Sequence, residues 1–479
     1  MKILLINPPA ANIIRESLPP VIEDETGVFP PLGLLYIAAC VEEAAGCSVQ
    51  VLDCQAEKID HQALPAVIRG MAPDLVGIQV MTFTLIDAAR TARAVREAQP
   101  RAFIVLGGPH PTIYPGESVL LPAVDAVIPG EGERVFKTLV EALQSGKSPE
   151  RVPGVVTRNT KDLPVVFEYI QNLDDLKMPA RHLIDVNKYN SPLARTNPVT
   201  TMMSSRGCPY ECVFCDRPQM GRKFRARSAV SVVAEMRHCR ETLGIGEIVF
   251  YDDTFTVDKQ RVLDICRLIG DGGLKVSWDI RARIDTVTPD MIRALRKAGC
   301  HRIHYGVESG SRRIQKRLRK NLDLERVKSV FALTRQEGIE VLGYFMIGNP
   351  DETEDDMKKT FDLIASLPMD YAHIGIFTPY PGTKIYKEAL ETGFYQDDYW
   401  RSFASNPGAE FRPRYWNQYF SDEELLAFMK KAYARFYSRP RYLWERLLKV
   451  RSLDELGRKG NLGWKLLRSV RAGRHRRDP

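Results

Sequence analysis

Over the first 150 residues, short runs of Val, Ile and Leu alternate with longer amphipathic runs. Five of the short runs are closed by turn-forming residues, as buried strands are. They cover residues 2–9, 48–55, 75–82, 102–110 and 126–133. The runs between them have helical periodicity. This alternation predicts a doubly wound parallel sheet, which binds its ligands at the carboxyl edge of its strands.

A second series of the same kind follows. Its six strand patterns cover residues 198–208, 247–253, 276–283, 302–309, 340–350 and 372–382. Helical patterns follow most of these strands. We therefore expect a partial or full (β/α) barrel that carries its functional groups at the carboxyl ends of its strands.

Two further stretches complete the predicted organisation. Residues 151–194 contain few periodic segments and several prolines, which predicts a linker with a small ribbon, and the end of the chain has helical patterns. We expect an α/β protein with an N-terminal doubly wound domain, a linker, a barrel core and a helical C-terminal region. Their predicted bounds are 1–150, 151–194, 195–415 and 416–479.

Composition excludes several classes of protein. The 479 residues are 44% hydrophobic and 27% charged, which is close to the average of globular proteins. No run of 18 uncharged apolar residues occurs, and the first residues form a strand pattern ending in Asn-Pro-Pro rather than a signal peptide. We therefore expect a cytoplasmic protein. The nine cysteines are odd in number and mostly far apart, which argues against a disulfide framework.

The positive charge is concentrated at the end of the chain. Residues 435–479 contain 14 Lys and Arg against 4 Asp and Glu, whereas the whole chain has a net charge of +8. Trp444 and Trp464 lie among these basic residues. This pattern is typical of a helical cap on the core, and equally of a segment in peripheral contact with an anionic membrane. Nucleic-acid binding is the weakest interpretation, because no recognised reading module accompanies the charge.

Three cysteines fall on one short loop after the first strand of the second series. Cys208, Cys212 and Cys215 can hold three corners of a cubane iron-sulfur cluster, which usually takes four Cys ligands, and so leave one iron open. A structural zinc site is the alternative, but it needs four protein ligands in paired spacing, and no second pair is evident.

The C-x3-C-x2-C spacing, with Phe214 before the last cysteine, resembles the signature of radical S-adenosylmethionine (SAM) enzymes. The resemblance covers about residues 195–415. It implies a 4Fe-4S cluster on Cys208, Cys212 and Cys215, whose reduced form cleaves SAM to a 5′-deoxyadenosyl radical. Further motifs of the family recur in order. The resemblance implies that SAM contacts Phe214 of the cysteine loop, and that Asp252 and Asp253 bind its amino group, Glu308 and Ser309 its ribose and carboxylate, and Ile347 and Asn349 its adenine.

Two of these residues, and two arginines on the next strand, also attract attention by their own chemistry. Asp252 and Asp253 are adjacent acids at a strand end, which is costly unless a cation or ammonium lies nearby. Asp253 is alternatively a helix cap. Arg281 and Arg283 alternate on one strand and so point to one face, where two guanidiniums can clamp the SAM carboxylate. A surface pair is the alternative for these arginines.

The N-terminal domain resembles the cobalamin-binding module of one large radical SAM subfamily. Gly107 and Gly108 at a strand end would let a bulky ligand approach the backbone, and Thr82 can donate a hydrogen bond to a nucleotide tail. By resemblance, the cobalamin contacts are Thr82, Gly107, Gly108, His110, Gly130 and Glu131. The Asp-x-His-x-x-Gly fingerprint is missing after the first strand, so we expect cobalamin bound without a lower histidine ligand. A degenerate docking module is the alternative.

The resulting hypothesis is a cobalamin-dependent radical SAM enzyme that modifies an unactivated carbon. It is similar to the group of the anaerobic magnesium-protoporphyrin IX monomethyl ester cyclase and the class B methyltransferases. Methyl transfer to a hydrophobic or lipid-like small molecule is favoured, with a cyclase or oxidative reaction as the alternative. Less favoured are a methylthiotransferase and a non-catalytic cobalamin or SAM sensor. An electron donor such as flavodoxin or ferredoxin is the expected protein partner.

Overall fold

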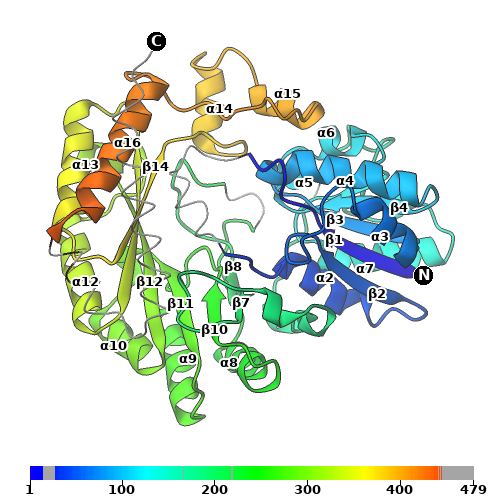
Figure 1. The fold of residues 1–479 in the computed structure, drawn as a ribbon, viewed down its shortest axis with the longest axis horizontal. Coiled ribbons are helices and arrows are strands. Elements are labelled where there is room, and N and C mark those ends of the chain that lie inside the picture. Colours follow the sequence, from blue (N-terminus) through cyan, green and yellow to red (C-terminus); the bar gives the residue numbers. More distant parts are fainter. Residues whose placement is uncertain (15–26, 166, 217–219, 441, 443, 445–479) are drawn as a thin grey trace.

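The computed structural model describes residues 1–14, 27–165, 167–216, 220–440, 442 and 444. It contains two large sheets, one in the blue and cyan part of the chain and one in the green and yellow part (Figure 1). None of the described helices is long and apolar enough to cross a membrane. Residues 445–479, which form most of the basic segment, lie outside the described residues, and so does the membrane contact predicted for them.

The first sheet contains the five parallel strands that the sequence predicts. Its order is β2-β1-β3-β4-β5-β6. The sixth strand, β6 (Val156–Thr157), pairs antiparallel with β5 and comes from the stretch predicted as a linker. The parallel strands are β1 (Lys2–Asn7), β2 (Ser48–Asp53), β3 (Leu75–Gln79), β4 (Phe103–Gly107) and β5 (Ala126–Ile128).

Helices cover both faces of this sheet because its strands are apolar on both faces. Leu5 of β1 packs in one core with α2 and α7, whereas Leu4 and Ile6 pack in the other with α3 and α4. Two short helices, α5 and α6, follow β4. The helices are α2 (Leu32–Val41), α3 (Leu64–Met71), α4 (Leu85–Ala98), α5 (Pro109–Ile113), α6 (Pro115–Leu120) and α7 (Gly132–Gln144).

The second sheet is a parallel partial barrel with the order β14-β13-β12-β11-β10-β7. Among the described residues, β7 and β14 are its two edges and do not pair with each other. Of the two predicted alternatives, the barrel is therefore the partial one. A small antiparallel ribbon of β8 (Ser205–Arg206) and β9 (Arg225–Ala226) flanks the cysteine loop. The barrel strands are β7 (Val199–Met202), β10 (Glu247–Phe250), β11 (Ser277–Ala282), β12 (Cys300–Glu308), β13 (Glu340–Ile347) and β14 (Tyr371–Ile376).

Successive residues of the barrel strands face opposite sides. Trp278, Ile280, Ile303 and Val341 belong to the large apolar core on the side that the helices cover. The helices that follow the strands are α8 (Ala229–Arg237), α9 (Lys259–Asp271), α10 (Pro289–Lys297), α11 (Arg312–Arg317), α12 (Leu324–Gln336) and α13 (Glu354–Ser366). Three more helices follow β14: α14 (Lys384–Glu391), α15 (Tyr399–Ser405) and α16 (Asp422–Tyr437).

Side chains occupy the two open edges of the barrel, where backbone groups would otherwise lack partners. At β7, the buried guanidinium of Arg181 donates to the carbonyl of Thr201 at 2.7 Å. At β14, the Ile374 amide donates to the hydroxyl of Tyr433 on α16 at 2.8 Å, and the Ala372 amide donates to Tyr437 at 3.3 Å. The helical C-terminal region therefore begins as a cap on the barrel.

Replacing Tyr433 with Phe should destabilise the protein by about 1–3 kcal/mol, because the buried Ile374 amide would lose its acceptor. The free energy of unfolding from chemical denaturation measures this loss. Tyr419→Phe is the matched control, because Tyr419 is 58% exposed. Equal stability of the Tyr433→Phe variant and the wild-type protein would show that this hydroxyl does not hold the edge.

Candidate active site at the junction of the two sheets

The three cysteines of the candidate cluster site lie on the loop that leaves β8. Gly207 opens this loop with φ +81°, and a Cβ there would lie 2.3 Å from the carbonyl oxygen of Lys223, so only glycine fits. Cys212 is buried, Cys208 is half-buried and Cys215 is exposed. The loop therefore carries one sulfur toward the protein interior and one toward the surface.

Contacts with the barrel hold this loop in place. The amide of Val213 donates to Leu318 O at 3.2 Å, and the amide of Ile385 donates to Val213 O at 3.1 Å. The guanidinium of Arg283 lies 3.5 Å from Cys212 Sγ and so adds a third contact between the loop and the barrel. Three sulfur donors on one anchored loop fit three corners of a 4Fe-4S cluster.

Asp252 and Asp253, the two acidic residues after β10, have different surroundings and different roles. Asp252 is buried and accepts hydrogen bonds from the Ser204 amide and from the hydroxyls of Ser204 and Ser205, so it positions the segment that leads to the cysteine loop. Asp253 is an exposed residue directly after it, but its carboxyl group is partly desolvated, and this desolvation together with the carboxylate of Asp252 raises its pKa. An incoming ammonium group would relieve this cost, so Asp253 is the better candidate for the SAM amino group.

The expected arginine clamp does not form as a pair. Arg283 is engaged by Asp285 through two hydrogen bonds of 3.0 and 2.9 Å, and it also donates to Lys320 O. Arg281 instead faces the cavity, stacks 4.1 Å above the ring of Tyr251 and donates to Phe250 O. Arg281 lines the cavity, whereas Arg283 does not and is held by Asp285, so Arg281 remains as the stronger candidate SAM contact of the two.

The residues expected to bind the SAM ribose and carboxylate sit at the end of β12. Glu308 has φ +70°, is buried and forms an ion pair with Lys320 at 2.9 Å. Ser309 is buried and its hydroxyl lies 3.1 Å from that of Thr360. Lys320 Nζ also lies 5.9 Å above the Phe214 ring, which joins this strand end to the cysteine loop.

The adenine-contacting strand of the prediction is β13. The side chain of Ile347 lies in the apolar core, and its carbonyl already accepts a hydrogen bond from Phe377. Asn349 is buried and donates from its amide side chain to Met346 O and to Glu352, but its Oδ1 has no hydrogen-bond partner among the described residues. This unpartnered acceptor fits an amino group such as that of adenine, so Asn349 is the stronger candidate of the two.

A cavity of about 1040 Å³ lies between the two sheets. This volume is at the upper limit of ordinary small-molecule sites, as expected where a large cofactor and a substrate meet. Gly107, Gly108 and Gly130 contribute backbone to its wall from the first sheet. Gly108 has φ +112°, and a Cβ there would lie 2.9 Å from the carbonyl oxygen of Val80, so the chain approaches the ligand space as bare backbone.

Two of the predicted cobalamin contacts lie behind this wall. Thr82 and His110 are absent from the described residues that line the cavity, and His110 Nδ1 lies 3.3 Å from the Thr82 hydroxyl. Burial lowers the pKa of His110 to about 3, so its imidazole is neutral. His61, the other histidine of the first domain, forms a hydrogen bond of 2.8 Å with Asp87. The glycine backbone, rather than an imidazole, therefore faces the ligand space.

Glu131 lines the cavity, but its carboxylate is already engaged. It accepts two hydrogen bonds from Arg225 at 2.7 and 3.0 Å and one from the Ile170 amide, and Arg206 lies 3.5 Å away. The neighbouring Glu133 pairs with Arg206. The carboxylate of Glu131 thus belongs to buried ion pairs that join the first sheet to the ribbon flanking the cysteine loop, and its cobalamin contact stays a prediction. We name these pairs the interdomain clasp.

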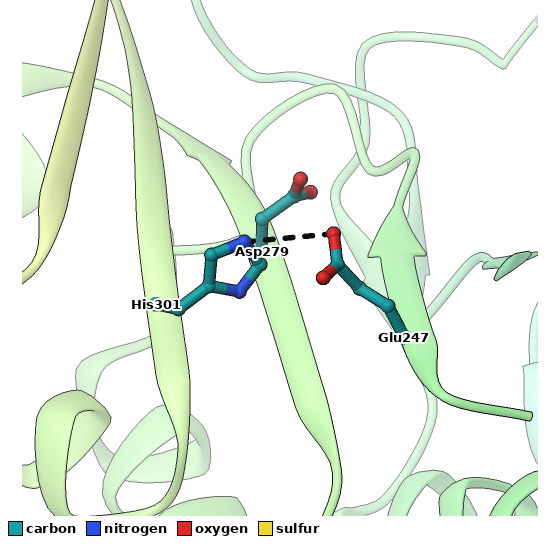
Figure 2. Close-up of side chains that lie close together, drawn as sticks. All are labelled: Glu247, Asp279 and His301. Carbon is teal, nitrogen blue, oxygen red and sulfur yellow. Dashed lines mark ion pairs between the residues drawn. The ribbon is translucent and has the colours of Figure 1, made fainter. Parts of the chain in front are cut away.

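A group of polar residues on the inner face of the barrel escaped the sequence-based prediction. Glu247 and Asp279 line the cavity, and together with His301 they offer ligand atoms within 4.8 Å of one another (Figure 2). His304 and Tyr344 line the same wall. The sequence contains a signal for this polar face. Residues 279 and 281 on one strand, and 302 and 304 on the next, are polar, and residues two apart on a strand point to the same face.

Comparison with known proteins agrees with both halves of the chain. Residues 202–364 match the family model of the radical SAM superfamily, and residues 20–140 match that of the B12 binding domain. An uncharacterized methyltransferase of Pyrococcus horikoshii is 34% identical over 452 residues, which cover 92% of this chain and 94% of that protein.

Two other similarities extend this finding. Cytidylyl-2-hydroxyethylphosphonate methyltransferase of Streptomyces wedmorensis is 27% identical over 448 residues, covering 82% of each chain. The structure of the cobalamin-dependent S-adenosylmethionine radical enzyme OxsB, with aqua-cobalamin and S-adenosylmethionine bound, superposes with a TM-score of 0.74. That alignment has 17% identity and covers 98% of this chain and 71% of the other, so it shows a shared fold.

Replacing Cys212 with Ala should remove most of the iron and abolish reductive cleavage of SAM, because two thiolates cannot fix a cubane cluster. Iron analysis after anaerobic reconstitution measures the first effect. Cys40→Ala is the matched control, since Cys40 lies on α2 of the first domain and should keep full iron content. Four irons retained in the Cys212→Ala protein would refute the assignment.

The cob(II)alamin form of the protein should give an electron paramagnetic resonance spectrum without nitrogen splitting from an axial imidazole. The reason is that neither His61 nor His110 lines the cavity wall of the first domain. A clear triplet splitting would contradict this expectation, and so would a failure to bind cobalamin. His110→Ala is the control, because it should leave the spectrum unchanged.

Proposed function

Because the chain belongs to the radical SAM superfamily and carries a B12-binding domain, we propose that it transfers a methyl group to an unactivated carbon of a small molecule. It is a cobalamin-dependent radical SAM enzyme, whose cofactors are a 4Fe-4S cluster, SAM and cobalamin. Methyl transfer as the reaction is our proposal for this chain, and the shared cavity is the observation that carries it.

The cavity supports this reaction by its position. Glycine backbone of the first domain lines one side, and Tyr251, Arg281 and His304 of the barrel line the other. A methyl donor on the first domain and a radical generated at the barrel can therefore reach one substrate from opposite sides. Enclosure between the two sheets also excludes water, which protects a reactive carbon centre.

The residues of this chain have three tasks in the proposed reaction. Cys208, Cys212 and Cys215 would hold the cluster, and Asp253 with Arg281 would orient the amino and carboxylate groups of SAM. Gly107, Gly108 and Gly130 would let cobalamin approach the backbone. When bound, these cofactors supply the radical and the methyl group, and the protein supplies orientation and a dry site.

The substrate proposal has an apolar component. Phe29, Leu193, Met203 and Leu342 line the cavity, so a hydrophobic or lipid-like body would be accommodated there. As electron donor we propose a flavodoxin or ferredoxin that docks near the exposed Cys215.

The decisive experiment uses holoenzyme reconstituted anaerobically and supplied with methylcobalamin, a reductant and SAM carrying a deuterated methyl group. We expect 5′-deoxyadenosine and S-adenosylhomocysteine to form, together with a methylated product that carries the unlabelled methyl group of methylcobalamin after the first turnover and the deuterated one after later turnovers. Mass spectrometry of extracts before and after reaction detects all three. Formation of 5′-deoxyadenosine with an oxidised or cyclised product, and without methylation, would overturn methyl transfer in favour of a cyclase-type reaction.

A further inference from the structure

The inner face of the partial barrel is far more polar than packing requires. The outer faces of β11 and β12 carry Trp278, Ile280 and Ile303, whereas the inner faces carry Asp279, Arg302 and other charged or polar groups. A barrel interior that serves stability alone is filled mainly with branched apolar residues. Buried polar groups are costly unless they find partners, so this face indicates a ligand.

A β-bulge in β12 brings these groups together. Trp278 pairs with Cys300, but the next residue, Asp279, pairs with Arg302, so His301 is the extra residue. Bulges of this kind re-aim side chains and are common beside active sites. As a result Arg302 Nη1 and His304 Nε2 each lie 3.5 Å from Asp279 Oδ2.

Asp279 is the central member of this group, because it contacts both Arg302 and His304. Its side chain is buried in the cavity wall, and Oδ1 has no hydrogen-bond partner among the described residues. Burial alone would raise its pKa, but His304, Arg302 and Arg281 outweigh that effect and lower the pKa to about 2. The carboxylate is therefore ionised and presents one oxygen without a donor, which native proteins rarely tolerate in the absence of a ligand or water.

A second acceptor lies next to it. His304 Nδ1 is 3.0 Å from the Tyr344 hydroxyl, and burial lowers the pKa of His304, so its ring carries one proton. With that proton on Nε2, directed at Asp279, Nδ1 is an acceptor and the Tyr344 hydroxyl must donate to it. The remaining lone pairs of the Tyr344 oxygen are then free to accept, and Tyr344 lines the cavity.

We propose that Asp279 and Tyr344, the latter oriented by His304, bind a pair of neutral hydroxyl groups on the substrate. The Asp279 carboxylate and the Tyr344 hydroxyl oxygen are two acceptors on one wall, so a substrate that satisfies both must bring two hydrogen-bond donors. The inference rests on the proposed function, because the bound molecule is the methyl acceptor of that reaction. The apolar wall residues then contact the rest of the substrate, which makes it an amphiphile with a hydroxylated end.

The positive charges of Arg302 and Arg281 favour neutral hydroxyl groups over charged donors such as ammonium. The guanidinium of Arg302 lies 3.5 Å from Asp279, and Arg281 lines the same wall. Two neighbouring cations disfavour a substrate ammonium group, and they also disfavour a metal ion between Glu247, Asp279 and His301. Burial further raises the pKa of Glu247 to about 7 and lowers that of His301 to about 2, so this pair can share a proton without a metal (Figure 2).

Binding of three six-carbon probes to the unreacted holoenzyme tests this assignment. Hexane-1,2-diol, hexylamine and hexanoate share an apolar body and differ in the polar end, and saturation-transfer NMR measures their affinities. We expect the diol to bind most tightly and to lose at least about tenfold in affinity in Asp279→Asn and in Tyr344→Phe. Asp264→Asn on the outer surface of α9 is the matched control and should bind the diol as the wild-type protein does.

Each other outcome overturns the proposal. Tighter binding of hexylamine would identify an ammonium site, and tighter binding of hexanoate would assign the site to the arginines. Undiminished diol binding in both variants, or no diol binding in the wild-type protein, would remove the hydroxyl site. Circular dichroism and iron content verify that the variants fold. Because no probe is turned over, failure here is separate from failure to detect methyl transfer.

Discussion

The interdomain clasp is the interaction on which the geometry of the site depends. Arg206 directly precedes Gly207 and Cys208. With Arg225 it forms ion pairs with Glu131, at the start of α7, and with Glu133 in the first turn of that helix. All four side chains are buried, so their charges are stabilised by one another, by hydrogen bonds to nearby backbone, and by the rings of Tyr36 and Tyr169 that lie under the two guanidiniums. Loss of one partner would leave a buried charge unpaired. Such pairs tolerate little displacement, and they therefore fix the distance between the cysteine loop and the glycine-lined wall of the first sheet.

A second buried ion cluster extends this constraint to the edge of the barrel. Glu235 on α8 pairs with Arg181 at 2.7 Å and also with Arg227, and Arg181 reaches β7 through Thr200 and Thr201. The ribbon, the first helix of the barrel and its open edge thus share one network. The planar guanidinium suits this task because each arginine can satisfy several acceptors in fixed directions. The barrel stays open at β7 because side chains, rather than another strand, satisfy that edge.

The sequence was sufficient to predict the order of strands and helices in both sheets, because buried parallel strands are marked by uninterrupted apolar runs. It was also sufficient to place the cysteines on one loop. It could not decide which partner a charged side chain chooses. Glu131 pairs with Arg225, 94 residues away, and Asp252 binds Ser204 and Ser205 rather than facing the cleft. The short strand β6 lacks a periodic signal, and the bulge at His301 depends on register with β11, which no local pattern records.

The expectation of a hydrophobic substrate illustrates both limits of the sequence, namely that it does not show the partners of charged side chains or the register between strands. It rests on the basic, Trp-containing end of the chain, since contact of that segment with a membrane would fit a lipid-like substrate. The barrel side of the cavity wall is instead formed by the inward-facing residues of β10 to β14. Those residues read as ordinary strand positions until the register places Asp279, Arg302 and His304 side by side. An apolar outer face is needed for the barrel to fold, so its residue types are dictated by packing with the helices. The inner face does not pack against the helices, so packing does not require apolar residues there. Its polar residues therefore indicate what the cavity binds rather than how the barrel folds.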